Sequence, residues 1–327
     1  MASPEKVTTD LLIIGAGPTG LYAAYYAGFR GLSVAVVDSL PELGGQITAM
    51  YPEKAIFDVA GFPTVKGRDL VAGLAEQAAT SAPAYLLGRT ALTLTEHEES
   101  VTIGLDDGTE VRAGAVIITA GIGKFSPRPL PVGEQWLGRG LEFFVPSFDP
   151  YVGKEIVIVG GGDSAFDWAL NLEPLAKSVT LVHRRDAFRA HKRTVDQVRA
   201  SGVEIITRAQ VTAIRGDQTL QEVEITVDGQ PALVRSAQAL VAALGFLADL
   251  GPLQQWGLEV EKRHIVVNPA MRTNLERVFA AGDITEYAGK VRLIAVGFGE
   301  AATAVNNAAV VIDPTAHVFP GHSSEGS

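Results

Sequence analysis

Cysteine is absent from all 327 residues of the sequence. Without thiols the chain forms no disulfide, and it has no thiolate to bind a metal, hold an iron–sulfur cluster or act as a catalytic nucleophile. We therefore expect no metal site. Any redox activity must also proceed without the cysteine pair that disulfide reductases place beside a flavin.

Basic residues and long apolar runs are also scarce. The 27 Lys and Arg residues are outnumbered by 37 Asp and Glu residues, and the net charge of −10 has the wrong sign for nonspecific nucleic-acid binding. A local basic patch can still bind an acidic protein. No apolar run approaches the roughly twenty residues that span a membrane, and the first ten residues contain no apolar signal core. We therefore expect a cytoplasmic protein without membrane or nucleic-acid partners.

The region from Asp10 to Asp38 has the order of a complete dinucleotide-binding unit. An apolar strand, 11–14, precedes Gly15, Gly17 and Gly20 in GxGxxG spacing, and a helix over 21–29 and a strand over 33–37 follow. The glycines allow a tight turn, close approach of a pyrophosphate and close helix packing, and the acid can bind a ribose. A glycine-rich turn without a ligand is the alternative, but the full order of elements favours binding.

A second copy of this pattern begins at Glu155. Strand 155–159 leads into a GxGxxA sequence at Gly160, Gly162 and Ala165, then a helix from Phe166 and a strand over 178–182. The acid of the first copy is replaced by the run His183, Arg184, Arg185. Arginines bind a 2′-phosphate bidentately, so this copy is predicted to prefer NADP. A solvated basic cluster is the alternative interpretation.

Later strands also occur twice, which predicts a duplicated domain. Strands are expected over 84–96, over 101–112 with a break at the hairpin-turn dipeptide Asp107-Gly108, and over 115–119 in the first copy. In the second copy they are expected over 204–207 and 240–244, with a hairpin signal at Asp228-Gly229. A proline-rich crossing over 124–131 separates the copies. The expected fold class is α/β, with two Rossmann-like domains of the three-layer ββα type: residues 1–122 with 248–327, and residues 123–247.

Three other segments carry candidate functional residues. Tyr51 lies in a long loop after Asp38 and can either stack on a planar ring or pack on the core. Asp283 follows a strand and can bind a ribityl chain, and a small-residue helix over 297–309 can begin against a flavin. The tail, 317–327, is rich in Ser and Gly and has the composition of a disordered segment.

One ribose-acid site and one arginine-rich site indicate one bound flavin and one diffusible nicotinamide. Hydride passes between the two cofactors, so no acid or base residue is required for this step. Without a cysteine relay, electrons must leave the flavin for an external acceptor, and a one-electron carrier protein is a natural one. The alternatives are an NADPH diaphorase acting on quinones, a flavin monooxygenase, although no FxGxxxH signature is present, and a non-enzymatic nucleotide-sensing flavoprotein.

Several motifs resemble one family over nearly the whole chain, roughly 9–324. They are GAGPTG (15–20), GGQ (44–46), YPEK (51–54), GGGDSAFDWA (160–169), HRRDAFRAH (183–191), FAAGDI (279–284) and GFGEAATAVNNA (297–308). Together they resemble the thioredoxin-reductase-like ferredoxin–NADP reductases, also called type 2. The Asp167-Trp168 pair, the missing cysteines and the C-terminal extension separate this chain from thioredoxin reductases.

The resemblance implies roles for individual residues. It implies a NADPH:ferredoxin (or flavodoxin) oxidoreductase with FAD, in which the flavin is stacked between Tyr51 and, from a partner subunit of a homodimer, His322. Ser324 is a departure, because relatives often carry Thr in this run. The implied FAD residues are Gly15, Gly17, Thr19, Gly20, Asp38, Gln46, Tyr51, Ala91, Phe125, Asp283, His322, Ser323 and Ser324. The implied NADPH residues are Gly160, Gly162, Ser164, His183, Arg184, Arg185 and Arg189.

Overall fold

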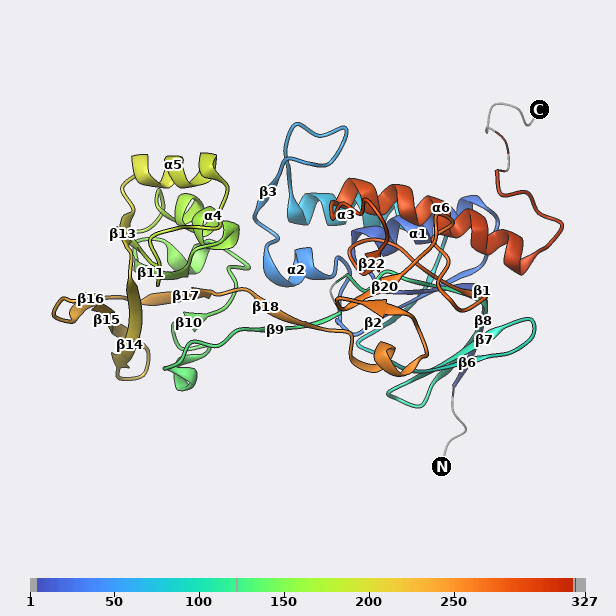
Figure 1. The fold of residues 1–327 in the computed structure, drawn as a ribbon, viewed down its shortest axis with the longest axis horizontal. Coiled ribbons are helices and arrows are strands. Elements are labelled where there is room, and N and C mark those ends of the chain that lie inside the picture. The colour runs from blue at the N-terminus through green and yellow to red at the C-terminus, as the bar shows by residue number, and fades with distance from the viewer. Residues whose placement is uncertain (1–4, 122, 320, 322–327) are drawn as a thin grey trace. The chain divides into compact units, whose positions relative to one another are not determined.

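The first glycine-rich turn joins strand β1 (Lys6–Ile14) to helix α1 (Pro18–Phe29), and strand β2 (Val34–Asp38) follows. A computed structural model describes residues 5–121, 123–319 and 321 of the chain. The chain divides into two compact units, one formed by residues 1–124 with 248–327 and the other by residues 125–247 (Figure 1). The first unit therefore contains the first glycine turn and the C-terminal segment 248–327.

A seven-stranded sheet organises the first unit. Its order is β5-β2-β1-β8-β7-β6, with β21 paired to β8. The pairs among β5, β2, β1, β8 and β21 are parallel, whereas β8, β7 and β6 pair antiparallel. The second half of central β1, residues 11–14, is apolar and buried because both its faces are covered there. The other strands are β5 (Ala84–Leu87), β6 (Ala91–Glu96), β7 (Val101–Leu105), β8 (Glu110–Ile118) and β21 (Val278–Ala280).

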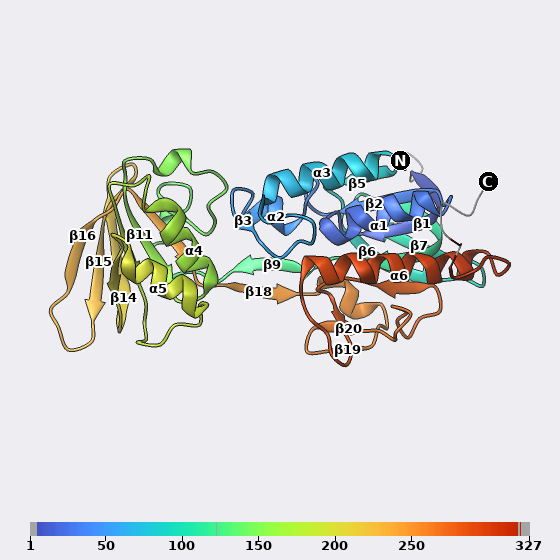
Figure 2. The same ribbon diagram turned by 90° about the horizontal axis from the view of Figure 1, so that it is seen from above.

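Three helices pack side by side on this unit, with α1 between α3 (Gly67–Ala79) and α6 (Ile294–Ile312) (Figure 2). Small residues make the contacts close. Ala23, Ala24 and Ala27 of α1, and Ala301 and Ala304 of α6, are completely buried. Since an alanine side chain ends at Cβ, the helix backbones approach the sheet and one another closely.

Shorter elements complete the first unit. They are α2 (Gln46–Met50), the antiparallel pair β3 (Ala55–Ile56) and β4 (Val65–Lys66), the 3₁₀ turn Gly251–Gln255, and the small sheet of β19 (Val260–Glu261), β20 (His264–Val266) and β22 (Thr285–Glu286). The chain crosses between the units along two paired strands, β9 (Lys124–Pro127) and β18 (Phe246–Asp249).

The second unit repeats the plan with a five-stranded, fully parallel sheet in the order β10-β17-β11-β12-β13. These strands are β10 (Leu141–Glu142), β11 (Glu155–Gly160), β12 (Ser178–Val182), β13 (Glu204–Ile206) and β17 (Ala239–Ala243). The helices are α4 (Asp163–Leu172) and α5 (Lys192–Ala200), with 3₁₀ turns at Glu134–Trp136 and Asp149–Tyr151. An antiparallel sheet adds β14 (Ala209–Gly216), β15 (Leu220–Val227) and β16 (Leu233–Ser236).

Two strand predictions are wrong. The segment 84–96 is two strands, because the chain turns after Leu87 at Gly88, whose φ is +67°. β5 then pairs with β2, and β6 pairs with β7. The segment 115–119 is not a separate strand, since Ala115–Ile118 forms the buried end of β8. The start of β8 alternates in burial and lies between β1 and antiparallel β7, whereas its continuously buried end lies between β1 and parallel β21, so the one strand resembles two.

The expectation that no apolar segment is long enough to cross a membrane is also wrong. Helix α6 meets that criterion by its 19 residues and its mean hydropathy of 1.3. Its buried face, however, belongs to the core of the first unit, where Gly297, Ala301 and Val305 pack. A single helix of this kind is typical of the interior of a soluble protein and is weak evidence for a membrane span.

Candidate cofactor-binding sites

The turn after β1 has a geometry that only glycines permit. Gly15 has a φ of +113°, and a Cβ there would lie 2.6 Å from the carbonyl oxygen of Thr119. A Cβ on Gly20 would lie 1.8 Å from the carbonyl oxygen of Gly15. A Cβ on Gly17, in contrast, would meet nothing within 4 Å. Two glycines are thus required by the protein itself, and the third faces open space.

Gly17 is also the N-cap of α1, and its position leaves the first turn of the helix without a side-chain cap. The first N–H groups of a helix have no partner within the helix, and with the helix dipole they form a site for an anion. Pro18 occupies the first turn, where its lack of an N–H costs nothing. Open space beside uncapped N–H groups fits a pyrophosphate.

Asp38, at the end of β2, lies beside the same turn. Its Oδ2 accepts a hydrogen bond from the Ala16 N–H at 2.6 Å, and its Oδ1 accepts one from the Leu40 N–H at 2.8 Å. Burial raises the pKa of Asp38, whereas these two N–H groups act in the opposite direction. A carboxylate has about four acceptor sites, so Asp38 can hold the turn in place and still accept from ribose hydroxyls.

Ala91 begins β6, opposite Leu105. The turn that precedes it is attached to the segment after β2, because the Arg89 N–H donates to the carbonyl oxygen of Asp38 at 3.0 Å and the Gly88 N–H donates to that of Leu40 at 2.9 Å. The chain before Ala91 therefore runs beside the acid of the first turn. This placement fits contact with the adenine half of a dinucleotide.

Thr19 lies where three segments of the first unit meet. Its Oγ1 is 2.9 Å from the position of a Cβ on Gly282 and 2.5 Å from that of a Cβ on Gly297. Gly282 follows β21, and Gly297 lies in the first turn of α6. Only glycines at these two positions leave room for the Thr19 side chain, so the first helix turn, the end of β21 and the start of α6 converge there.

Gln46 and Tyr51 flank α2. A Cβ on Gly121 would lie 2.8 Å from Nε2 of Gln46, so this amide lies against the end of the β8 segment. Burial, followed by the negative charges of Asp283 and Asp58, raises the pKa of Tyr51 to about 12. Tyr51 is thus close to Asp283 and also packs against the core of the unit. Packing on the core is therefore observed, and stacking of Tyr51 on a planar ring stays a prediction.

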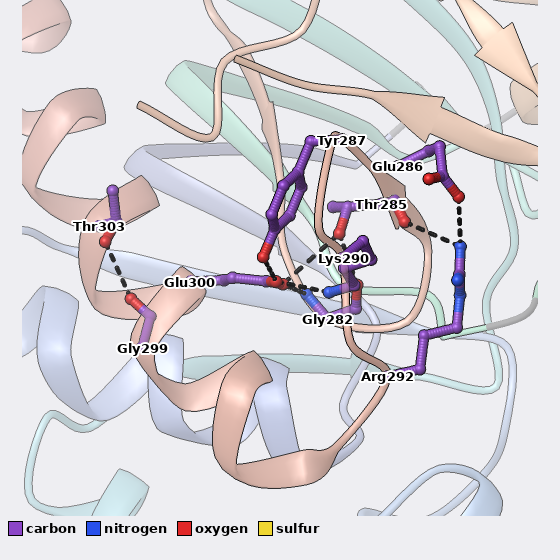
Figure 3. Close-up of polar contacts among 9 residues, drawn as sticks. All are labelled: Gly282, Thr285, Glu286, Tyr287, Lys290, Arg292, Gly299, Glu300 and Thr303. Carbon is purple, nitrogen blue, oxygen red and sulfur yellow. Dashed lines mark hydrogen bonds and ion pairs between the residues drawn. The ribbon is translucent and has the colours of Figure 1, made fainter. Parts of the chain in front are cut away.

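Asp283 lies in the turn between β21 and β22 and is mostly buried. Burial raises its pKa, whereas the positive charges of Lys290 and Arg292 favour the ionised form. Gly282, the preceding residue, is held by Lys290 and Glu300 (Figure 3). The sequence analysis missed this pair. Glu300 is the one charged residue in the apolar stretch 294–312, and that isolation was the signal available.

Four predicted flavin residues cannot be placed by their side chains. Phe125 lies in β9, but only its backbone is described. His322, Ser323 and Ser324 lie outside the described residues.

In the glycine loop of the second unit, as in the first, one glycine is required by close packing and another faces open space. A Cβ on Gly160 would lie 2.5 Å from the carbonyl oxygen of Ala243, whereas a Cβ on Gly162 would meet nothing within 4 Å. Gly162 is the N-cap of α4, without a side-chain cap, and Ser164 is exposed in the first turn. A second open helix N-terminus therefore fits a second pyrophosphate.

His183 packs against this loop. A Cβ on Gly161 would lie 2.2 Å from Cε1 of the His183 ring. Burial lowers the pKa of His183, and the positive charges of Arg184, Arg185 and Arg189 act in the same direction, against a hydrogen bond with the Ala187 backbone. The neutral ring therefore supports the loop by filling the space that Gly161 leaves.

The arginines are brought to the loop by backbone contacts. The Arg189 N–H donates to the carbonyl oxygen of Gly161 at 2.7 Å, and the side chains of Arg184, Arg185 and Arg189 are exposed. Asp186, the acid within the run, is paired with Arg208 at 2.5 Å. Because that acid is neutralised, the cluster keeps the positive charge that a 2′-phosphate requires.

Comparison with known proteins identifies the class that these two sites define. The profile of the pyridine nucleotide-disulphide oxidoreductase family matches residues 9–308. Thioredoxin reductase from T. acidophilum superposes with a TM-score of 0.80 at 25% identity over 94% of this chain and 99% of its own. The enzyme from Lactococcus lactis gives 0.78 at 26%, over 93% and 99%. The chain belongs to this family and has the thioredoxin-reductase-like two-domain α/β fold, without the cysteine pair.

Relatives narrow the class to one group. A ferredoxin–NADP reductase from a Nocardioides species is 76% identical over 100% of both chains. Another, from Salinispora arenicola, is 63% identical over 97% of this chain and 99% of its own. The chain is therefore a member of the ferredoxin–NADP reductase family, whose cofactors are FAD and NADP(H).

Proposed function

We propose that the protein transfers electrons between NADP(H) and ferredoxin, or flavodoxin, through one bound FAD. The observation that carries this proposal is the pairing of two glycine loops, one beside an acid and one beside arginines, in a chain without cysteine. When bound, FAD exchanges a hydride with the nicotinamide and electrons with the acceptor. With no thiol to receive them, the electrons pass to a separate protein.

FAD is assigned to the first unit. The support is the convergence of Thr19, Gln46, Tyr51 and Asp283 on the side of the unit where the glycine turn and Asp38 lie. In this arrangement the N–H groups of α1 bind the pyrophosphate, Asp38 a ribose and Asp283 the ribityl chain. Tyr51 packs on one flavin face, and none of these residues is asked to act as an acid or base.

NADPH is assigned to the second unit. The support is the open N-terminus of α4 at Gly162, the exposed Ser164 and the arginine cluster beside the loop. The cluster distinguishes NADPH from NADH. The 2′-phosphate of NADPH is negatively charged and offers three acceptor oxygens to guanidinium groups, whereas the free 2′-hydroxyl of NADH is uncharged. His183 positions the loop without touching the nucleotide.

An anaerobic titration of the purified protein tests the proposal. The protein is expected to be yellow, to be bleached by NADPH at least about tenfold more efficiently than by NADH, and to reduce ferredoxin afterwards. A colourless chain that takes up no FAD would contradict the proposal. Bleaching by NADPH without electron transfer to any ferredoxin or flavodoxin would instead favour a diaphorase that uses quinones.

We also propose that the protein is a homodimer formed through α1. In this helix Leu21, Ala23, Ala24 and Ala27 are buried in the core, and the rings of Tyr22, Tyr25, Tyr26 and Phe29 form a row beside them. Tyr22 and Tyr26 also pack partly against the core, whereas Phe29 is exposed. Phe298 of α6 extends the row at 5.1 Å from Tyr22. An aromatic face of this kind on a surface helix favours a second copy of the chain as its partner.

The remaining proposals rest on the family resemblance. His322 covers the second flavin face from the partner subunit, with Ser323 and Ser324 near the reactive nitrogen. A cytoplasmic location without membrane partners is proposed because soluble NADPH and ferredoxin are drawn from that compartment. The burial of α6 in the core of the first unit supports the absence of a membrane span.

A further inference from the structure

The first unit contains a buried ion pair that none of the roles above uses. Lys290 and Glu300 form it, and their side chains are only 1% and 5% exposed. Lys290 belongs to the loop that follows β22, and Glu300 lies in the second turn of α6. Removing two charges from water is unfavourable, and an apolar pair of the same volume often serves stability equally well. The presence of the pair therefore calls for another explanation.

The pair holds both polar backbone groups of one residue, Gly282 (Figure 3). The Lys290 ammonium donates to the Gly282 carbonyl oxygen at 2.9 Å, and Oε2 of Glu300 accepts from the Gly282 N–H at 2.7 Å. Thr285 Oγ1 also donates to that carbonyl, at 2.8 Å. Gly282 has a φ of +83°. An apolar pair could fill this space, but it could not orient the two peptide groups that flank Gly282.

The rest of the network satisfies the charges. Tyr287 points at Glu300 in Figure 3, and its hydroxyl donates to Oε1 at 2.6 Å. The Lys290 ammonium also lies over the Tyr287 ring, 5.5 Å from its centroid. Because each charge has several partners, the network is rigid, and a fully satisfied buried network fixes a single local geometry.

Gly282 stands between two residues assigned to the flavin. Its Cα face is closed by Thr19, and its carbonyl belongs to the peptide bond that leads into Asp283. Any rotation of this peptide group would therefore move the Asp283 carboxylate and the wall of the Thr19 site together.

We propose that Lys290 and Glu300 are positioning residues for the flavin: by holding the two peptide groups on either side of Gly282, they aim Asp283 at the ribityl chain. This inference rests on the proposed assignment of FAD to the first unit. The side chains themselves do not touch the flavin. Their effect reaches it through the backbone of one glycine.

Three variants separate positioning from stability. Lys290→Met and Glu300→Gln each leave one buried charge alone, so each is expected to lower the unfolding midpoint. The double variant carries no unpaired charge and should regain most of that loss. It still lacks the ammonium that holds the Gly282 carbonyl, however, and should therefore keep a weakened hold on FAD.

The readouts are taken on the full-length holoprotein. FAD release on dilution, followed by flavin fluorescence, should give a dissociation constant about ten- to a hundredfold higher for the double variant than for the wild type. Its visible flavin bands should shift in position as the ribityl chain is released. The inference would be overturned if the double variant regained not only stability but also the FAD affinity and the flavin spectrum of the wild type.

Arg292→Gln is the matched control. It removes the second cation whose charge favours the ionised form of Asp283, but this guanidinium pairs with Glu286 at 2.7 Å and donates to the Thr285 carbonyl oxygen rather than to Gly282. Its FAD dissociation constant should change by less than about fivefold. If Arg292→Gln weakened FAD binding as much as Lys290→Met, the loss would be due to the positive charge of the loop, and the inference would be overturned. If the wild-type protein binds no FAD, the proposed function is overturned together with the inference. If the wild type binds FAD and the variants bind it equally well, only the inference is overturned.

Discussion

Asp38 carries two tasks with one carboxylate. Its spacing from the glycines predicts a ribose acceptor, and the structure adds hydrogen bonds from the Ala16 and Leu40 N–H groups that fasten the glycine turn to β2. Both tasks favour an acid with several free lone pairs. An asparagine there would lose the charge that draws both N–H groups, so ligand binding and turn geometry would change together.

Arg184 tests the nucleotide preference at the residue scale. Arg184→Ala should raise the KM for NADPH about ten- to a hundredfold, because charge-assisted bonds to the 2′-phosphate worth roughly 1.5–3 kcal/mol are lost. The KM for NADH should stay nearly constant, since NADH has no such phosphate. Steady-state kinetics with both nucleotides measure the effect.

Arg215→Ala serves as the matched control in the same unit, since that arginine pairs with Glu222 and Glu224 on β15. It should leave both KM values within about twofold. If Arg184→Ala also left the KM for NADPH unchanged, the arginine cluster would be a solvated surface feature.

At the scale of elements, α1 depends on how closely its start approaches the turn. A Cβ on Gly20 would lie 1.8 Å from the backbone oxygen of Gly15 and 2.7 Å from Oγ1 of Thr119. Backbone atoms cannot move aside cheaply, so Gly20→Ala should lower the free energy of unfolding by about 1–3 kcal/mol. Urea denaturation of the full chain measures this.

Gly73→Ala provides the opposite case in α3. A Cβ there would meet nothing within 4 Å, and the residue lies inside a helix. The substitution should stabilise the chain by about 0.4–1 kcal/mol, because alanine loses less backbone entropy than glycine when the helix forms. Equal effects of the two substitutions would contradict the assignment of Gly20 to close packing.

At the scale of the whole molecule, the aromatic face of α1 predicts the state of association. Phe29 is 54% exposed at the end of the row of tyrosines. Phe29→Glu should convert the proposed dimer to a monomer, since a buried carboxylate at an interface is strongly unfavourable without a partner. Sedimentation equilibrium measures the mass directly.

Phe57, 72% exposed in the loop between β3 and β4, offers the same substitution away from α1. Phe57→Glu should leave the measured mass at that of a dimer. A monomeric wild type, or dissociation by both substitutions alike, would count against dimerisation through α1.

The whole chain also shows why electrons must leave it. A thioredoxin-reductase-like fold normally reduces a disulfide, but this sequence has no cysteine to form one. The fold therefore supplies the nucleotide sites, and the missing residues exclude the internal relay. What remains is transfer to a separate carrier, as the names of the relatives indicate for those proteins.

Local patterns alone determined much of this protein. The strand, glycine turn, helix and acid of the first copy lie within 29 residues, and the second copy repeats them, so spacing was sufficient to predict both sites. The absence of thiols and the exchange of an acid for arginines are likewise properties of the chain itself. Each of these features depends on neighbours in sequence.

Tertiary structure decided what depends on distant neighbours. It divided 84–96 into β5 and β6, because each half pairs with a different strand. It placed Thr19 between Gly282 and Gly297, and it joined Lys290 to Glu300 around the backbone of one glycine, Gly282. A buried charge shows in the sequence only as an exception to an apolar pattern, since its partner is chosen by the packing of separate elements and not by spacing along the chain.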